Sequence, residues 1–374
     1  MSSSYKVKKH NKGILIVIFI FGFIIGNLIT NISSISRQEI TQVSIVYSSE
    51  KASWMTIAYG NFLDEWEKNH PNEKIIIDMH PYGSSDSIIS ILNGEIFPTI
   101  WSPASSIWMS FLNTKWMDLP ANIDPIVNVD EAVKIIYSPI VIATWEEFNK
   151  THNIRGFSDL HQLNLDPESH VKMAHTDPRL SNSGFMSVIM ALSAASGISS
   201  EDLSMDDLLS ESNQQWLKEF ESSAVMYGKS TGFLSRYMQS GGPEALNIAF
   251  LYENLIRDIS STSTGGKVIA IYPEEGTLYS DHPFCILNGD WVSPEQKAVA
   301  EAFLDFLNEP ETIISALEYG FRPINSSIPL DPEIFNYENN GIAYNINVPE
   351  LKTPENGNVL LKIPDLWLLC KSTA

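Results

Sequence analysis

Cysteine and basic residues are scarce in this 374-residue chain, and each shortage excludes a class of protein. There are two cysteines, Cys285 and Cys370, and no CxxC or HExxH motif, so we expect no structural zinc site. Whether the two cysteines form a disulfide is left open. Lysine and arginine total 24 against 45 aspartates and glutamates, a formal net charge of −21. No basic stripe interrupts this acidic excess, so we expect no nucleic-acid partner.

A catalytic constellation is also lacking. No Gly-x-Ser-x-Gly elbow surrounds Ser183, and the eight histidines show no ligand spacing. His175 and His282 flank candidate ligand loops, and for each we expect a strand-end ring whose nitrogen is satisfied by a hydrogen bond. We therefore predict that the protein is not an enzyme and uses no cofactor. An extracellular hydrolase is the least supported alternative.

Charge is absent from residues 14–30, a mostly Ile, Phe, Leu and Val run that follows four lysines. Its length is at the short end of what spans a hydrocarbon core of about 30 Å. No Ala-x-Ala-like cleavage site follows closely, which favours an uncleaved anchor over a removed signal. The basic flank predicts a single-pass cell-membrane protein whose remainder, from about residue 38, is extracytoplasmic.

Strand and helix patterns alternate after this run. Apolar strands are expected at residues 43–47, 74–79 and 98–101, and helices at 55–66, 85–92 and 105–112. This alternation is typical of a parallel, doubly wound α/β sheet.

In the next stretch the strands and helices follow a different order. Its expected strands are residues 138–144, 171–175, 247–252 and 267–272, and its expected helices are 184–196, 215–227 and 233–239. The earlier alternation of strand and helix then returns, with a strand at 282–287 and a helix at 294–308 that begins Ser293-Pro294. From about residue 326 the sequence is irregular.

Small hydroxyl residues lie where four of the strands end. They are Ser48 and Ser49, Ser84 and Ser85, Ser102 within residues 101–105, and Ser183 within residues 176–184. Ligands of open α/β sheets bind beyond the carboxyl ends of strands, beside helix N-termini. Each hydroxyl can therefore cap its helix or present a donor to a ligand, which suits an anion.

The order of several short motifs carries a family resemblance. They are Trp101-Ser102-Pro103-Ala104-Ser105, His175-Thr176-Asp177-Pro178, Ser181-Asn182-Ser183-Gly184, Phe250-Leu251-Tyr252-Glu253, Tyr272-Pro273-Glu274-Glu275-Gly276-Thr277, Ser280-Asp281-His282-Pro283 and Tyr319-Gly320-Phe321-Arg322-Pro323. Over residues 42–325 the chain resembles extracellular solute-binding proteins of the type 2 periplasmic-binding fold, and most of all their molybdate-binding-like branch.

The resemblance implies two doubly wound α/β lobes joined by crossover strands that close on a ligand like a hinge. The expected divisions are residues 1–37 for the basic flank, anchor and tether, 38–140 for lobe 1, 141–279 for lobe 2, and 280–374 for the return to lobe 1 and a C-terminal extension. We expect that extension to pack on lobe 1 through Ile363 and residues 366–369.

The resemblance also implies which residues hold the ligand, since this branch binds oxyanions through hydroxyls and backbone N–H groups. The matching positions are Ser48 or Ser49, Ser84 or Ser85, Ser183 and Gly184, Ser230 or Thr231, and Tyr252. Ser102, at the end of the third strand, is a further candidate. Trp101 and Glu253 depart from a bare oxyanion pocket: an aromatic ring suits an organic ligand or sugar, and an inward carboxylate suits a cation or polyol.

These observations lead to one main hypothesis, a membrane-anchored extracytoplasmic protein that captures a small solute between two lobes for an ABC-type importer. A ligand-sensing or surface-interaction module without transport is the alternative. The sequence does not identify the ligand.

Overall fold

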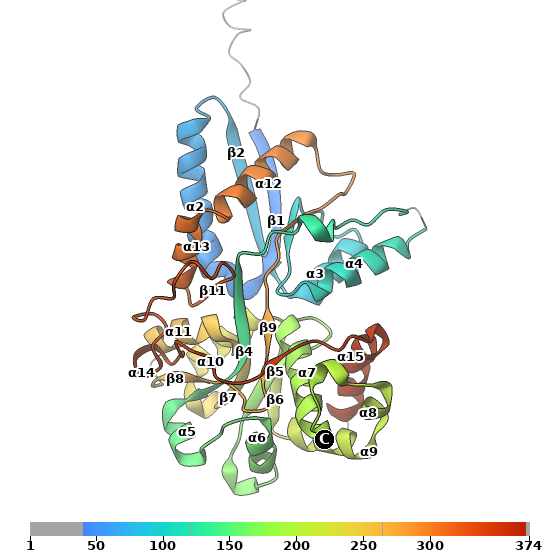
Figure 1. Cartoon of the computed structure of the whole chain (residues 1–374), viewed down its shortest axis with the longest axis vertical. Coiled ribbons are helices and arrows are strands. Elements are labelled where there is room, and N and C mark those ends of the chain that lie inside the picture. The colour runs from blue at the N-terminus through green and yellow to red at the C-terminus, as the bar shows by residue number, and fades with distance from the viewer. Residues whose placement is uncertain (1–39, 121, 264, 372–374) are drawn as a thin grey trace, which may run out of the picture.

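The computed structural model describes residues 40–120, 122–263 and 265–371, which form two α/β lobes placed one above the other (Figure 1). The expected anchor at residues 14–30 lies outside this part of the chain. Among the described residues, no helix combines the length and apolar character needed to cross a membrane.

The upper lobe in Figure 1 is built on a four-stranded sheet in the order β10-β3-β1-β2. Its strands are β1 (Ile40–Ser48), β2 (Lys74–Tyr82), β3 (Ile100–Ser102) and β10 (Cys285–Ile286). β1 pairs in parallel with β2 and β3, as the alternation predicted, whereas β10 is antiparallel to β3. Because β10 comes from late in the sequence, the chain leaves this lobe and returns to it.

Helices cover this sheet. They are α2 (Ala52–Asn69), α3 (Ser84–Leu92), α4 (Ile107–Met117), α12 (Pro294–Leu307) and α13 (Pro310–Leu317), with short 3-10 turns η1 (Ser49–Lys51) and η2 (Val129–Glu131). α12 begins where the sequence predicted, because Ser293 and Gln296 form a capping box and Pro294 occupies the first helical position. Phe303 of α12 packs edge-on against Phe62 of α2, 5.1 Å between ring centres.

The lower lobe holds an eight-stranded sheet whose main path runs β12-β9-β4-β7-β5-β6, with β8 and β11 also paired to β4. The strands are β4 (Ile136–Trp145), β5 (Met173–Thr176), β6 (Ala224–Gly228), β7 (Ile248–Tyr252), β8 (Val268–Ile271), β9 (Thr277–Ser280), β11 (Arg322–Pro323) and β12 (Glu350–Leu351). This sheet is mixed: β5 is parallel to β6 and β7, whereas β4 is antiparallel to β7, β8, β9 and β11. β4 and β9 run along the long axis between the lobes in opposite directions (Figure 1).

The helices of this lobe are α5 (Glu146–His152), α6 (Phe157–Asn164), α7 (Asn182–Ser196), α8 (Met205–Leu209), α9 (Glu211–Glu221), α10 (Thr231–Ala245), α11 (Glu253–Thr262), α14 (Tyr337–Asn340) and α15 (Gly357–Lys371), with turns η3 (Pro167–Ser169) and η4 (Ser200–Asp202). α7 is buried on nearly all sides, as its uninterrupted apolar pattern predicted. The expected helix at 215–227 is wrong at its end, because residues 224–228 form strand β6 and pair with β5.

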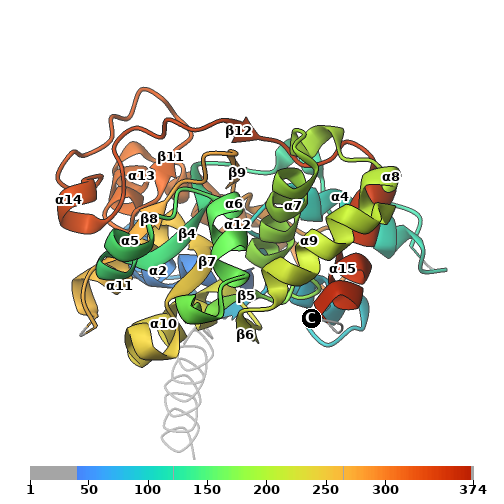
Figure 2. The ribbon, with the colours of Figure 1, turned by 90° about the horizontal axis from the view of Figure 1, so that it is seen from below.

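The C-terminal helix α15 packs on the lower lobe, so the expectation that it returns to lobe 1 is wrong. It lies beside α7, α8 and α9 (Figure 2). Trp367 is fully buried, with its ring centre 5.8 Å from that of His175 and 5.0 Å from that of Tyr227. The apolar pattern of residues 363–369 showed a face to be buried but carried no information about its partner.

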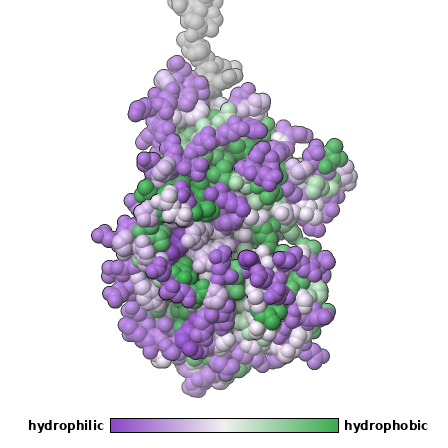
Figure 3. All heavy atoms as spheres, viewed as in Figure 1, coloured by the Kyte–Doolittle hydropathy of each residue, from purple (hydrophilic) through white to green (hydrophobic). Residues whose placement is uncertain are grey.

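Cys285 and Cys370, both within the described residues, form no disulfide with each other. Cys285 Sγ lies 3.3 Å from Met109 Sδ in the upper lobe, and Cys370 Sγ lies 3.7 Å from the Gln214 carbonyl oxygen in the lower lobe. The face of the molecule in Figure 3 is mainly hydrophilic, with apolar residues in scattered groups.

Candidate functional site

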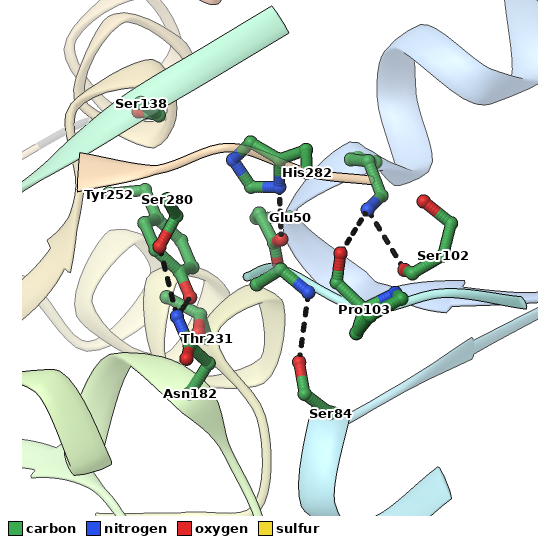
Figure 4. A network of polar contacts seen from close by, with 12 residues as sticks. Glu50, Ser84, Ser102, Pro103, Ser138, Asn182, Thr231, Tyr252, Ser280 and His282 are labelled. Atoms are coloured by element: carbon green, nitrogen blue, oxygen red, sulfur yellow. Dashed lines mark hydrogen bonds and ion pairs between the residues drawn. The ribbon is translucent and has the colours of Figure 1, made fainter. Parts of the chain in front are cut away.

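The two lobes meet where the carboxyl ends of β1, β2 and β3 face the N-termini of α7 and α10 and the end of β7. Figure 4 shows polar side chains from both lobes and from the crossover segment after β9 gathered at this junction. The predicted residues Ser48, Ser49, Ser84, Ser85, Trp101, Ser102, Ser183, Thr231, Tyr252 and Glu253 are all buried. Most of them lie at the junction, and the exceptions are given below.

Hydroxyl groups of the lower lobe form a linked cluster. Ser183 Oγ lies 2.8 Å from Thr176 Oγ1 and 2.7 Å from Thr231 Oγ1, and Thr176 Oγ1 accepts a hydrogen bond from the Gly184 N–H at 2.7 Å. A Cβ atom on Gly184 would lie 1.8 Å from the Thr176 carbonyl oxygen, so only glycine fits there. None of these bonds joins Ser183 to a histidine, so it has no base to activate it as a hydrolase nucleophile.

Asn182, which precedes Ser183 in the chain, forms hydrogen bonds with residues of both lobes. Its Nδ2 donates to the Tyr252 hydroxyl at 2.8 Å and to Ser280 Oγ at 2.9 Å (Figure 4). Its Oδ1 accepts from Trp108 Nε1 of the upper lobe at 2.7 Å. Burial raises the pKa of Tyr252, so its hydroxyl stays neutral. Asn182 belongs to the segment that the sequence singled out, but its central position was not predicted.

Two backbone groups also bridge the lobes. Ser49 Oγ accepts from the Gly232 N–H at 3.0 Å, and the Leu180 carbonyl oxygen accepts from the Asp86 N–H at 3.0 Å. The two lobes are therefore hydrogen-bonded to each other directly, as expected when lobes joined by a hinge have closed.

Three predicted residues of the upper lobe bond within that lobe or to the crossover segment. Ser84 Oγ accepts from the Ala104 N–H at 3.0 Å, and Ser102 Oγ donates to the Pro283 carbonyl oxygen at 2.8 Å. Trp101 is a fully buried core residue whose Nε1 donates to Ser87 Oγ at 2.9 Å. Its indole is therefore used in packing, and the expectation that it stacks on a ligand is wrong.

The Glu253 carboxylate is likewise bonded within the protein, so the expectation that it faces a ligand is wrong. Arg322 Nε donates to Glu253 Oε2 at 2.6 Å, and Arg322 Nη2 donates to Oε1 at 2.8 Å. The Tyr272 hydroxyl donates to the same carboxylate. Both charges of the ion pair are buried, and β11 carries the arginine from far along the sequence.

A second buried carboxylate, Glu50, stands at the junction instead. It lies in η1, directly after Ser48 and Ser49, and its Oε1 is 3.3 Å from Nδ1 of His282 (Figure 4). Ser48 Oγ, Glu50 Oε1 and both ring nitrogens of His282 are buried without a hydrogen-bond partner among the described residues. The expectation of a satisfied ring is therefore wrong for His282. It is confirmed for His175, whose Nδ1 lies 2.7 Å from the Thr176 carbonyl oxygen and whose Nε2 lies 3.0 Å from Glu221.

The neighbouring charges set the protonation of this pair. Burial by itself raises the pKa of a carboxyl group, but the His282 ring and the Lys51 ammonium outweigh it and hold the pKa of Glu50 below its usual range. Burial lowers the pKa of His282, so its ring is neutral at pH 7. Burial also lowers the pKa of Lys51 to about 7, and its ammonium donates to the carbonyl oxygens of Ser102 at 2.9 Å and Pro103 at 3.2 Å.

A cavity of about 290 Å³ opens between the lobes beside Ser49 and Glu50. Its other walls are residues of α2, α10 and α11, among them Ser53, Ser235, Arg236, Gln239 and Asp258. No group of three or more His, Cys, Asp or Glu side chains suited to a metal ion occurs in the part of the chain that the structure describes. The junction is therefore lined by hydroxyl, amide and carboxylate groups and has room for a small molecule.

Comparison with known proteins identifies the family. A family model described as bacterial extracellular solute-binding protein matches residues 51–322, so the chain belongs to that family. Its location is accordingly extracytoplasmic, and it groups with binding proteins rather than enzymes. No curated protein sequence matches the chain.

Solved structures share the fold at low sequence identity. A provisionally named spermidine/putrescine ABC transporter from Listeria monocytogenes has a TM-score of 0.62 at 15% identity, covering 89% of this chain and 100% of its own. The spermidine/putrescine substrate-binding protein of Streptococcus pneumoniae has a TM-score of 0.60 at 14% identity, over 89% and 99% of the two chains. A periplasmic binding protein from Actinobacillus pleuropneumoniae with fructose-6-phosphate bound has a TM-score of 0.58 at 15% identity, over 89% and 97%. These likenesses establish the two-lobe solute-binding fold.

Proposed function

We propose that this protein captures a small solute between its two lobes and delivers it to an ABC-type importer. The observation that carries the proposal is the junction itself, where buried Ser48, Glu50 and His282 have polar atoms without partners, next to hydroxyl and amide groups of the other lobe. Buried polar atoms without partners are costly, so a ligand that bonds to them stabilises the closed form.

Closure would complete the site. The upper lobe supplies Ser48, Ser49 and Ser84, and the lower lobe supplies Ser183, Gly184, Thr231 and Tyr252. Water around the solute is replaced by fixed donors and acceptors as the lobes meet. The hinge is formed by the crossover segments that contain β4 and β9, which pair with each other at Ser138 and Ser280.

The attachment to the membrane is part of this proposal. Residues 14–30 would anchor the chain, so that the solute-binding lobes, from about residue 38, work outside the cytoplasm close to a permease.

In the expected division, residues 38–140 and 280–374 belong to lobe 1 and residues 141–279 to lobe 2. The packing of α15 on α9 would move the C-terminal extension to lobe 2.

The ligand class does not follow from the relatives. Their names mention polyamines in two cases and a sugar phosphate in another. The molybdate-binding-like assignment suits the hydroxyl cluster around Ser183, but a carboxylate such as Glu50 opposes a bare oxyanion.

A thermal-shift screen of the purified full chain tests the proposal. The compounds are oxyanions, sugars, amines, amino acids and divalent metals, because a ligand bound to the folded state alone stabilises it by about 2.7 kcal/mol at a hundredfold excess over the dissociation constant. We expect one class to raise the melting temperature, and Ser183→Ala and Tyr252→Phe to weaken that effect. Ser212→Ala on the exposed side of α9 is the matched control. No shift with any class would contradict solute capture.

A further inference from the structure

A second and larger cavity opens between the lobes, on the side of the molecule where α4 and α15 lie (Figure 1). Its volume of about 600 Å³ is typical of pockets that bind small organic molecules. One wall is α4 of the upper lobe, and the other is formed in the lower lobe by residues 178–179 and the first turns of α15. The family match ends at residue 322, so it does not account for the wall that α15 supplies.

The lining of this cavity is mainly apolar and includes three aromatic rings. Trp108 and Phe185 are buried, with ring centres 5.2 Å apart, and the ring centre of Phe111 lies 5.8 Å from that of Trp108. The indole nitrogen of Trp108 is bonded to Asn182, so the ring is held in place between the polar junction and the cavity. The other apolar lining residues are Ile107, Pro178, Leu360, Leu361 and Pro364.

Both charged residues of the lining are cations. They are Lys115 and Arg179, and no Asp or Glu lines the cavity among the described residues, although acidic residues outnumber basic ones 45 to 24 in the chain. Asp118 lies 3.7 Å from Lys115, and Asp177 accepts from Nε and Nη2 of Arg179, which leaves Arg179 Nη1 outside that pair. The two cationic side chains are 45% and 47% exposed, so each has room for a further anion. The amino end of α15 adds a partial positive charge.

We infer that this cavity binds a small aromatic carboxylate, whose ring packs against Trp108 and Phe185 and whose carboxylate meets Lys115 and Arg179. An aromatic body covers the apolar walls, and a carboxylate matches the N–H donors of ammonium and guanidinium groups. An inorganic anion would leave the apolar walls uncovered, and an organic cation would be repelled. The site is separate from the polar junction, and its occupant would also hold the two lobes together because its walls belong to both.

Calorimetry on the full chain tests the ligand class, with naphthalene-2-carboxylate as the probe. The comparison compounds are naphthalene-2-carboxamide, which keeps the rings without the charge, and acetate, which keeps the charge without the rings. We expect the probe to bind and both comparison compounds to bind at least tenfold more weakly.

Substitutions at exposed positions of the lining test the location. Leu361→Glu places a carboxylate in the cavity and should weaken binding of the probe at least tenfold, and Lys115→Gln removes a cation and should weaken it at least threefold. Leu368→Glu, on α15 but outside the lining, and Lys68→Gln in α2 are the matched controls and should leave the affinity unchanged.

The inference would be overturned if the probe does not bind, if the carboxamide binds equally well, or if Leu361→Glu keeps the native affinity. Ser183→Ala separates this cavity from the proposed solute site, and we expect it to leave binding of the probe unchanged. Loss of binding in Ser183→Ala would place the probe at the polar junction, which would overturn this inference while supporting solute capture.

Discussion

Gly83 of the upper lobe lies directly against Leu180 of the lower lobe. A Cβ atom at position 83 would be 2.4 Å from the Leu180 carbonyl oxygen, closer than real Cβ contacts come. The backbone of Gly83 has φ −75° and ψ 147°, which any residue adopts. Glycine is therefore required here for clearance between the lobes and not for its own conformation.

Gly83→Ala should consequently block closure while leaving each lobe folded. We expect its melting temperature without ligand to stay close to that of the native chain and its solute affinity to fall at least tenfold. Gly60→Ala in α2 is the control, because a Cβ at that position meets nothing within 4 Å. Calorimetry and thermal denaturation of the three proteins check both expectations. Native affinity in Gly83→Ala would mean that the lobes do not approach this closely when the solute binds.

The ion pair of Glu253 and Arg322 predicts a loss of stability. Glu253→Gln leaves a buried guanidinium without its carboxylate, which costs about 3–5 kcal/mol of unfolding free energy. Urea denaturation measures this loss. Replacing both residues, as Glu253→Gln with Arg322→Met, should recover part of it. If Glu253→Gln instead keeps its stability and loses solute affinity, the residue belongs to the binding site after all.

Lys51 predicts a pH dependence of stability. Its pKa is about 7 in the folded protein and about 10.4 in an unfolded chain. Between these values the unfolded state binds more protons, so the contribution of Lys51 to the unfolding free energy increases with pH from about 7 to 10.4. Urea denaturation at pH 7, 8 and 9 should show this increase in the native chain and in the exposed control Lys68→Met. It should be absent in Lys51→Met, and equal slopes in all three proteins would contradict the assignment.

Trp367 predicts that α15 is an integral part of the lower lobe. Trp367→Ala removes a fully buried indole and should lower the unfolding free energy by about 3–5 kcal/mol. Leu368→Ala, at a position 38% exposed, should change it by about 0.5 kcal/mol or less. Denaturant titration compares the two. A small effect of Trp367→Ala would mean that the helix is only loosely attached.

Local pattern was enough to predict much of this fold. The apolar strand at residues 43–47, the buried helix after Ser183 and the capped helix at Pro294 are all present, because each depends on neighbouring residues alone. The direction of β4 relative to β7 and the partner of α15 were missed. Both depend on contacts between segments far apart in the sequence, about which local periodicity carries no information.

In the candidate site, too, local sequence pattern predicted some residues, and others depend on contacts between distant segments. The hydroxyls after β1 and β2 were found because strand ends can be located in the sequence. Glu253 was predicted to face a ligand because nothing in the sequence links it to Arg322, and only the folded chain brings these two residues together. Glu50 was not predicted, although it follows Ser48 and Ser49 directly at a strand end.

The most direct test of solute capture is a distance between the lobes measured with and without solute. Spin labels on Asp64→Cys in α2 and Glu211→Cys in α9 occupy exposed positions, while the native cysteines are buried. Pulsed electron paramagnetic resonance is recorded before and after adding the solute that most raises the melting temperature. We predict that the distance distribution moves to a single shorter value when the solute is added. An identical distribution in both samples would contradict capture by closure of the two lobes.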